Sequence, residues 1–271
     1  MEKSLNKNML MALGTGTSVG IPQIGCSCLV CTSLDHRDQR MRTSVFIQTK
    51  NGQRILVDTT PDLRTQILSN KISAVDFAII THEHADHLHG IDDLRPFCFG
   101  PPPREIPVFA NASTKASIEA RFPYIFHHKG PVLGGGIPRL QLQSVELEKP
   151  TTLFGEEFFF FNYPHGHAET MGFILGDLAY IVDCHSLPDH IVKILKEKKL
   201  KLLIIDCLKQ GSHTTHLTVE KCFEYVREIK AEKTGLIHIS HDLSHSVLKE
   251  LAMREFGESV FPLYDGQKLF Y

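Results

Sequence analysis

The feature that most constrains this chain is a group of metal-binding side chains directly after an apolar segment. The segment Phe77–Thr81 has the character of a buried strand, and His82 and His84 follow it with one residue between them. In an extended segment, side chains two positions apart project to the same side. Asp86 and His87 come next, where the chain can turn into a helix. Four imidazole and carboxylate groups within six residues suit zinc, manganese or iron, so we predict a metal centre at this strand end.

Three further candidate ligands stand at or near the ends of later apolar segments. They are His165, Asp183 and His238. Taken singly, each has an ordinary structural explanation: an Asp at a strand end is commonly a turn residue, and a His within a strand is commonly a hydrogen-bonded core residue. Their shared position at strand ends is what makes them candidates together. Asp58 follows another strand and is expected to support ligand histidines from behind, whereas Asp62 is expected to cap a helix or orient the loop.

The remaining pattern predicts an α/β fold. Asn51-Gly52 and Gly176-Asp177 are turn signals between apolar runs, so each predicts a hairpin. Hairpins come first and strands later alternate with helices, which favours an αββα sandwich of two mixed sheets flanked by helices. We expect a single domain over residues 1–271. Predicted strands cover 9–13, 45–48, 55–58, 77–81, 106–110, 158–163, 172–175, 179–183, 202–206 and 236–239; predicted helices cover 61–69, 113–121, 189–199, 219–230 and 245–256; 101–103 and 129–138 are predicted loops.

Composition narrows the class of protein. The net charge is -2, so there is no overall positive field to attract nucleic acid or an acidic membrane. The apolar run near the start is too short for a secretory signal, and no run approaches the length of a membrane span. We therefore expect a cytoplasmic protein that binds no membrane and forms no stable complex with nucleic acid; a homodimer is compatible with the sequence.

A second metal-binding pattern lies near the start of the chain. Cys26, Cys28 and Cys31 place three thiols within six residues. In a reducing compartment such spacing predicts structural zinc rather than disulfides, and three thiolates need a fourth ligand. The other four cysteines are scattered and are expected to be small core residues or surface thiols: Cys98, Cys184, Cys207 and Cys222.

Two more histidines, His213 and His216, lie in a loop between a predicted strand and a predicted helix. A loop above a strand end can reach substrate, so either histidine could act in catalysis. The alternative is that Thr218 caps the helix while both histidines lie in solvent.

The order of these residues resembles that of the metallo-β-lactamase superfamily over nearly the whole chain. The resemblance is more specific to its PhnP-like phosphodiesterase branch. The motifs that carry it are His82-x-His84-x-Asp86-His87 followed by His165, Asp183 and His238, together with Gly25-Cys26-Ser27-Cys28, Asp58-Thr59-Thr60-Pro61-Asp62, Gly90-Ile91-Asp92-Asp93-Leu94-Arg95 and Tyr264-Asp265-Gly266.

The resemblance implies two catalytic metal ions, zinc or manganese, held by two sets of ligands with Asp183 as a bridge. The first set is His82, His84 and His165, and the second is Asp86, His87 and His238. His167 is an alternative to His165, but a His-Gly pair seven residues before Gly172 matches the family pattern better. By the same resemblance, His241 completes a structural zinc site with Cys26, Cys28 and Cys31.

For activity, the resemblance implies a metal-dependent phosphodiesterase acting on a small, possibly cyclic, phosphodiester. Hydroxide activated by the two metal ions would attack phosphorus, His216 would protonate the departing alkoxide, and His213 would contact phosphate. A different activity within the same superfamily is that of a ribonuclease that processes transfer RNA 3′ ends, although we find no long Gly- and Lys-rich insertion. The chain could also be a hydrolase of thioesters, esters or lactams, or a non-enzymatic sensor with an idle site.

Overall fold

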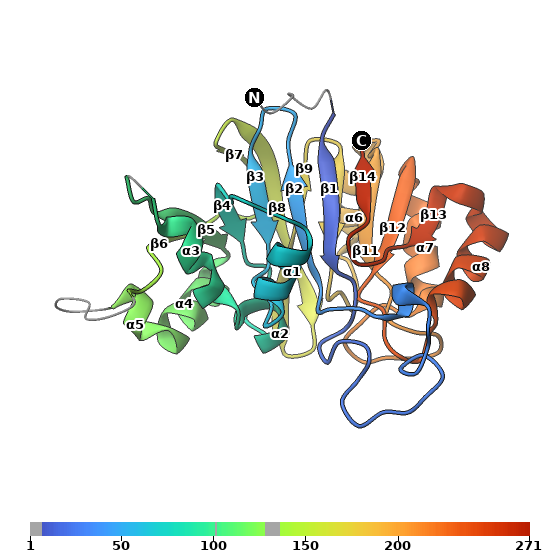
Figure 1. The fold of residues 1–271 in the computed structure, drawn as a ribbon. Coiled ribbons are helices and arrows are strands. Elements are labelled where there is room, and N and C mark those ends of the chain that lie inside the picture. The colour runs from blue at the N-terminus through green and yellow to red at the C-terminus, as the bar shows by residue number, and fades with distance from the viewer. Residues whose placement is uncertain (1–6, 101, 128–135) are drawn as a thin grey trace.

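The computed structural model describes residues 7–100, 102–127 and 136–271. Residue 101 and most of the predicted loop over 129–138 lie outside the described residues. Within them, two seven-stranded mixed sheets pack face to face and helices cover their outer faces (Figure 1). The predicted αββα sandwich is therefore confirmed.

The first sheet is built mainly from the first half of the chain. Its strands lie in the order β14-β1-β2-β3-β4-β5-β6, and β2 and β3 form the hairpin predicted at Asn51-Gly52. Neighbours from β3 to β6 run parallel. The strands are β1 Met9–Gly14, β2 Ser44–Gln48, β3 Arg54–Val57, β4 Phe77–Ile79, β5 Ile106–Ala110, β6 Leu140–Ser144 and β14 Lys268–Phe270.

The second sheet is built from the second half. Its order is β13-β12-β11-β10-β9-β8-β7, with antiparallel pairs from β7 to β10 and parallel pairs from β10 to β13. The strands are β7 Pro150–Leu153, β8 Glu156–His165, β9 Ala168–Leu175, β10 Leu178–Ile181, β11 Leu202–Asp206, β12 Lys233–Ile237 and β13 Val260–Pro262.

The helices divide between the two outer faces. The first five lie outside the first sheet, and the last three lie outside the second (Figure 1). They are α1 Leu63–Ser69, α2 Ala85–Leu88, α3 Arg95–Cys98, α4 Ala112–Arg121, α5 Pro123–Phe126, α6 Asp189–Glu197, α7 Val219–Ile229 and α8 His245–Phe256; short 3₁₀ turns span His36–Asp38, Ile91–Leu94 and Gly257–Ser259. No helix among the described residues is long and apolar enough to cross a membrane.

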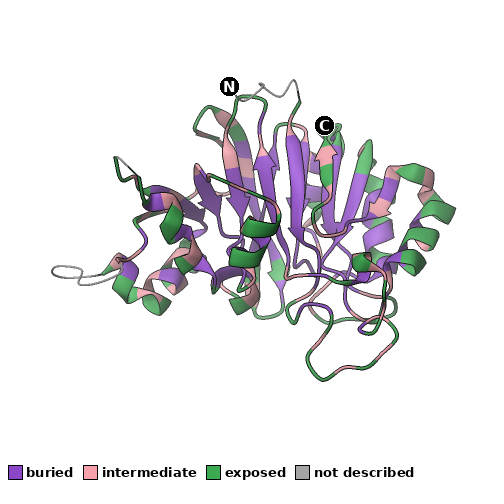
Figure 2. Ribbon diagram, viewed as in Figure 1, coloured by how far each residue is buried: buried purple, intermediate pink, exposed green. Residues whose placement is uncertain are grey.

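Three apolar clusters stabilise these layers. Strand β1 shows how one segment serves two of them: Leu10 and Ala12 face the space between the sheets, whereas Met9, Met11 and Leu13 face the helices outside. This follows from the alternation of side chains along a strand, and both faces of β1 are buried. Figure 2 shows the same division across the molecule, with buried residues along the strands and exposed residues on the outer sides of the helices.

Most predicted elements are observed, with shifts at their ends. Helix α1 begins at Leu63, so Pro61 lies in the preceding turn and not in the first helical turn. Strand β12 ends at Ile237, so His238 follows the strand instead of lying within it. Strand β8 is longer than predicted and ends at His165. The sequence did not predict β6, β7, β13 and β14; all four are short, and β6, β7 and β14 contain no buried residue.

The strand directions place the candidate residues at one edge of the sandwich. Strands β3, β4, β8, β10, β11 and β12 all end there, at the lower edge in Figure 1 where α2 lies, while the C-terminus lies at the upper edge. The carboxyl ends of such strands are where α/β folds commonly gather functional side chains.

Candidate metal centre

The first predicted ligand set comes together as expected. His82 and His84 follow β4, and His165 is the last residue of β8 in the other sheet. His165 Nε2 lies 3.2 Å from His84 Nδ1 and 3.5 Å from Asp183 Oδ2. The same Asp183 oxygen lies 3.5 Å from His82 Nε2. One ligand atom from each of the four residues lies within 4.8 Å of every other.

The second set adjoins the first through the same aspartate. His87 Nε2 lies 3.2 Å from Asp86 Oδ2 and 3.3 Å from Asp183 Oδ2. Asp183 Oδ1 lies 3.1 Å from His238 Nε2. Asp183 thus turns one oxygen toward His238 and the other toward His82, His87 and His165, so it belongs to both groups.

The donor atoms fit divalent metal ions. His82 Nε2, His87 Nε2, His238 Nε2 and Asp183 Oδ1 are buried and have no hydrogen-bond partner among the described residues. Such orphaned atoms are costly unless something binds them. Ligand atoms held about 2.0–2.1 Å from a tetrahedral zinc ion lie roughly 3.3 Å apart, close to the spacing found here. Burial lowers the pKa of His82 and His238, so these imidazoles are neutral and offer lone pairs near pH 7.

Three residues of this edge have a strained backbone. The φ angles of Asp58, Asp183 and His238 are 65°, 55° and 62°, in the left-handed region that non-glycine residues rarely adopt. Each follows the end of a strand closely, so the chain turns sharply there and aims its side chain across the edge. Strain of about 1–3 kcal/mol at each position is characteristic of functional sites.

Hydrogen bonds from behind fix the ligand rings. The buried Asp58 carboxylate accepts a 2.7 Å hydrogen bond from His87 Nδ1 and further bonds from Thr81, which supports the role predicted for it. His165 Nδ1 donates to the carbonyl of Thr215 at 3.0 Å. Asp62 makes no capping bond; its carboxylate instead binds the backbone N–H and guanidinium of Arg42, so it orients the loop.

His216 is joined to an aspartate that the sequence did not mark as a candidate. Its Nδ1 donates to Asp206 Oδ2 at 2.9 Å, and its ring lies 4.7 Å from the rings of both His165 and His238. Burial disfavours the charged imidazole, but the Asp206 carboxylate outweighs burial and raises the pKa of His216 to about 9. Asp206 ends β11, so the strand-end signal that marked Asp183 could also have found it.

The expectations for the neighbouring residues are met in part. His213 is exposed, with its ring 5.2 Å from that of His216. Thr218 does cap α7, by accepting from the backbone N–H of Lys221, yet His216 is not in solvent. His167 is exposed and belongs to neither ligand group, so the geometry favours His165. His185 is exposed as well.

An open pocket of about 660 Å³ gives access to the centre. Its lining includes His84, Asp86, His165, Asp183, His213 and His216. It also includes Arg121, the last residue of α4, which sequence reasoning missed because a basic residue at a helix end is commonplace.

The cysteine group forms a separate site. The Sγ atoms of Cys26, Cys28 and Cys31 lie 3.3, 3.6 and 3.6 Å from His241 Nδ1. All four ligand atoms lie within 4.8 Å of one another, as in a tetrahedral zinc site with three thiolates and one imidazole. His241 follows His238 by three residues, so the two sites share one segment of chain.

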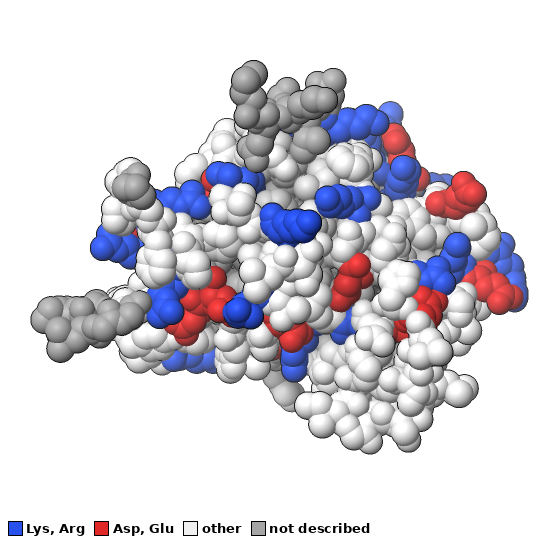
Figure 3. Space-filling view, viewed as in Figure 1, with Lys and Arg blue, Asp and Glu red and all other residues white. Residues whose placement is uncertain are grey.

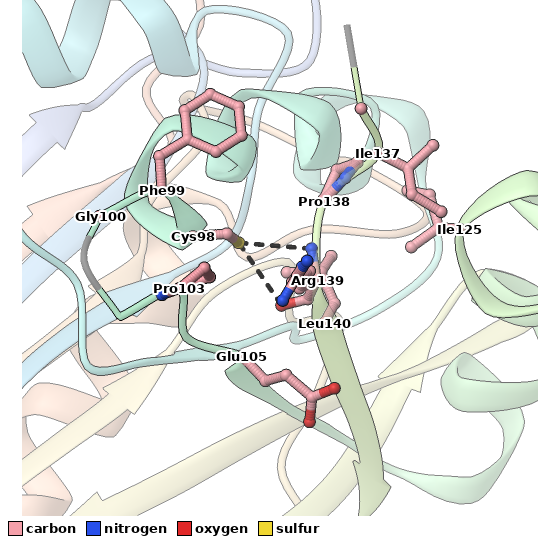
Figure 4. A pocket seen from close by; sticks show the side chains of 11 residues that line it. Cys98, Phe99, Gly100, Pro103, Glu105, Ile125, Ile137, Pro138, Arg139 and Leu140 are labelled. Atoms are coloured by element: carbon pink, nitrogen blue, oxygen red, sulfur yellow. Dashed lines mark hydrogen bonds between the residues drawn. The ribbon is translucent and has the colours of Figure 1, made fainter. Parts of the chain in front are cut away.

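The other cysteines are buried and do not join this site: Cys98, Cys184, Cys207 and Cys222. Cys98 lies in a different pocket of about 470 Å³, where its sulfur contacts the backbone of Arg139 (Figure 4). None of the predicted site residues lines that pocket.

Comparisons with known proteins agree with this site. Residues 53–239 match the family described as the Beta-lactamase superfamily domain. Together with the His/Asp groups, this match defines a metal-dependent hydrolase. A solved structure described as a new diphosphatase from the PhnP family is 35% identical, covers 98% of both chains and superposes with a TM-score of 0.86. The chain therefore belongs to the metallo-β-lactamase superfamily and to its PhnP-like branch.

Two other relatives bear on the comparison. An octanoyltransferase of Porphyromonas gingivalis is 35% identical over 255 residues, which is 94% of this chain but 50% of that protein. The chain spans about half the length of that relative. Zinc-bound PqqB from Methylobacterium extorquens is 18% identical over 96% of this chain and 99% of its own, with a TM-score of 0.78, and shows the fold alone.

Proposed function

We propose that this protein is a phosphodiesterase that hydrolyses a small, possibly cyclic, phosphodiester with two divalent ions, zinc or manganese, at the paired ligand groups. The observation that carries the proposal is the His216–Asp206 pair beside those groups. Hydrolysis of a phosphodiester expels an alkoxide, which is a poor leaving group. A positioned acid speeds such a step by about 10²–10⁴-fold.

The residues divide the chemistry between them. The paired groups would hold two ions, which would supply an activated water and neutralise charge on the phosphoryl oxygens. Asp206 accepts the hydrogen bond from His216 Nδ1, fixes the ring and favours its protonated form. The other ring nitrogen is then free to give a proton to the leaving oxygen. His213 lines the same pocket, which supports the role of phosphate contact that we propose for it.

A small substrate suits the surface better than RNA does. On the face shown in Figure 3, Lys and Arg side chains are mixed with Asp and Glu instead of forming one basic patch. The PhnP-family relative is named a diphosphatase, which also concerns phosphoryl groups. Thioester or ester hydrolysis is less well supported, because those leaving groups need less help from an acid such as His216.

The test compares two diesters with and without the acid. His216→Ala should retain both catalytic metal ions and slow a diester with an alkoxide leaving group by about 10²–10⁴-fold. It should slow a nitrophenyl diester much less, because nitrophenolate leaves without a proton. Steady-state rates and metal analysis of each variant provide the measurement.

Equal loss on both diesters would remove the acid role of His216. Strong thioesterase activity of the wild type, with no loss on either diester in the variant, would favour a thioester hydrolase. Cleavage of precursor transfer RNA at a higher kcat/KM than any small diester would favour the ribonuclease.

A further inference from the structure

The carboxylate of Asp206 uses one of its two oxygens and leaves the other without a donor. Oδ2 accepts hydrogen bonds from His216 Nδ1 and from the backbone N–H of Cys184, both at 2.9 Å. Oδ1 is buried and has no hydrogen-bond partner in the part of the chain that the structure describes. A buried acceptor without a partner is costly, and a carboxylate can accept at both oxygens. A donor for Oδ1 is therefore to be expected close by.

His238 has a nitrogen of the complementary kind. Its Nε2 lies 3.1 Å from Asp183 Oδ1, on the side of the second ligand group. A nitrogen that binds a metal ion gives its lone pair, so the proton of the neutral ring is carried by the other nitrogen, Nδ1. His238 Nδ1 is buried, has no hydrogen-bond partner among the residues described, and lies 4.0 Å from Asp206 Oδ1. A buried donor and a buried acceptor therefore lie close together, each without another partner in the described ranges.

Two other ligand rings show what His238 lacks. His87 Nδ1 donates to the Asp58 carboxylate at 2.7 Å, and His165 Nδ1 donates to the Thr215 carbonyl at 3.0 Å. A histidine that binds a metal ion almost always donates its second N–H to a carboxylate, a carbonyl or a water molecule, which fixes the ring. His238 needs such an acceptor as well.

Sheet pairing fixes Asp206 beside His238. Asp206 is the last residue of β11 and pairs in parallel register with Ile237, the last residue of β12, which His238 follows. The rings of His216 and His238 are stacked, with centroids 4.7 Å apart and planes 15° apart. The carboxylate lies next to the Nδ1 atoms of both rings, so its two oxygens can serve one ring each.

We propose that Asp206 is a positioning residue for both the metal ligand His238 and the acid His216, with Oδ1 serving the first ring and Oδ2 the second. A hydrogen bond spans about 2.7–3.2 Å, so the Oδ1 pair either closes by about 1 Å or shares one water molecule. In both cases Asp206 is the acceptor. The part that concerns His216 rests on the proposed function, whereas the part that concerns His238 requires only that the site binds metal.

The first experiment measures metal affinity without substrate, by calorimetric titration of manganese into the full chain stripped of its catalytic metals. Asp206→Ala removes both acceptor oxygens and should weaken the binding of one of the two catalytic ions by about 10–100-fold. Asp206→Asn offers one acceptor oxygen to three donors and should show a smaller loss, which keeps the test valid if Asp206→Ala does not fold. His216→Ala is the matched control: it removes the ring at Oδ2, leaves Oδ1 in place and should keep wild-type affinity.

The second experiment observes the hydrogen bond itself by nuclear magnetic resonance of zinc-loaded protein with ¹⁵N-labelled histidine. The Nδ1 proton of His238 should be protected from exchange with water and give a sharp signal. This signal should persist in His216→Ala and be lost in Asp206→Ala. The Nδ1 proton of His87, which Asp58 holds, is the internal control and should remain visible in both variants.

The outcomes separate this inference from the proposed function. Wild-type manganese affinity in both Asp206 variants, or a His238 signal that survives in Asp206→Ala, would overturn the inference, because Asp206 would then serve His216 alone. Equal weakening of both ions together with loss of the His87 signal would show general disruption of the site and would also count against it. Neither experiment uses substrate, so a wild type without phosphodiesterase activity would count against the proposed function and leave the role of Asp206 at His238 intact.

Discussion

The two groups of metal-binding residues differ in how the chain holds them. The ligands of the catalytic groups stand at the ends of strands from both sheets, and Asp58 and the Thr215 carbonyl support their rings from behind. The cysteine ligands lie in the segment between β1 and β2, where the one helical element is the short turn His36–Asp38. In Figure 1 this segment extends below the sandwich.

The two sites differ in whether the fold positions the ligands or a bound metal ion orders the chain around it. At the catalytic edge the ligands stand on strands that are held by sheet pairing and by the apolar core between the sheets, so the fold itself positions the site. In the cysteine segment Ile24, Leu29 and Leu34 are 95%, 91% and 101% exposed, so little apolar burial can order it. A bound zinc ion would supply that order instead. A buried pair, Arg40 with Asp38, helps by binding the carbonyls of Ser240 and Leu243.

The largest effect should come from removing a catalytic ligand. His165→Ala should strip one catalytic metal ion and abolish measurable turnover while the fold is retained, because sheet packing does not depend on this ring. His167→Ala, two residues away and exposed, should be much milder. Metal analysis and circular dichroism of both variants check this. The reverse order of severity would show that His167 is the ligand.

A smaller loss should follow from Asp58→Asn. The amide cannot accept both the His87 and the Thr81 hydrogen bonds as a carboxylate does, so His87 loses its fixed orientation. Loss of such a supporting partner typically weakens metal affinity by about 10–100-fold. Titration with manganese, with activity as the readout, measures it. Unchanged affinity would mean that strand packing alone orients the ring.

The cysteine site should affect stability more than catalysis. Cys28→Ser should remove one zinc ion per chain and leave two catalytic ions in place. The melting temperature should fall by at least about 4 °C, since each kcal/mol corresponds to roughly 2–4 °C in a domain of this size. Differential scanning calorimetry and metal analysis test it. Full zinc content in the variant would show that the structural site is misassigned.

The smallest effect concerns His245, a buried residue at the start of α8. Burial, with Arg37 and Arg40 nearby, lowers the pKa of His245 to about 4. Between these two pKa values His245 stays neutral in the folded protein, whereas in the unfolded chain it is protonated below its ordinary pKa of about 6.5. As the pH is lowered from 6.5 to 4, the free energy of unfolding should fall. It should fall less steeply in His245→Gln than in the wild type or in the exposed control His127→Gln. Parallel pH slopes in thermal melts would contradict this.

Local sequence patterns were enough to predict most of the helices and strands and most of the candidate site residues. The apolar runs and turn signals predicted β11 and α8 with the same bounds that the structure shows, because periodicity and capping are local properties. Short peripheral strands such as β6 and β14 were missed because they carry few buried residues and depend on a neighbouring strand for their hydrogen bonds.

The sequence by itself determined which chemistry was present: imidazoles, carboxylates and thiols in groups suited to divalent metals. Only the tertiary structure decided how they meet, because Asp183 joins two ligand groups whose members follow strands of two different sheets. It also brought Asp206 to His216 and set Arg121 at the mouth of the pocket, contacts that no local pattern predicts. Spacing along a chain fixes which side chains can be neighbours within one element, whereas contacts between distant elements follow from how the sheets pack.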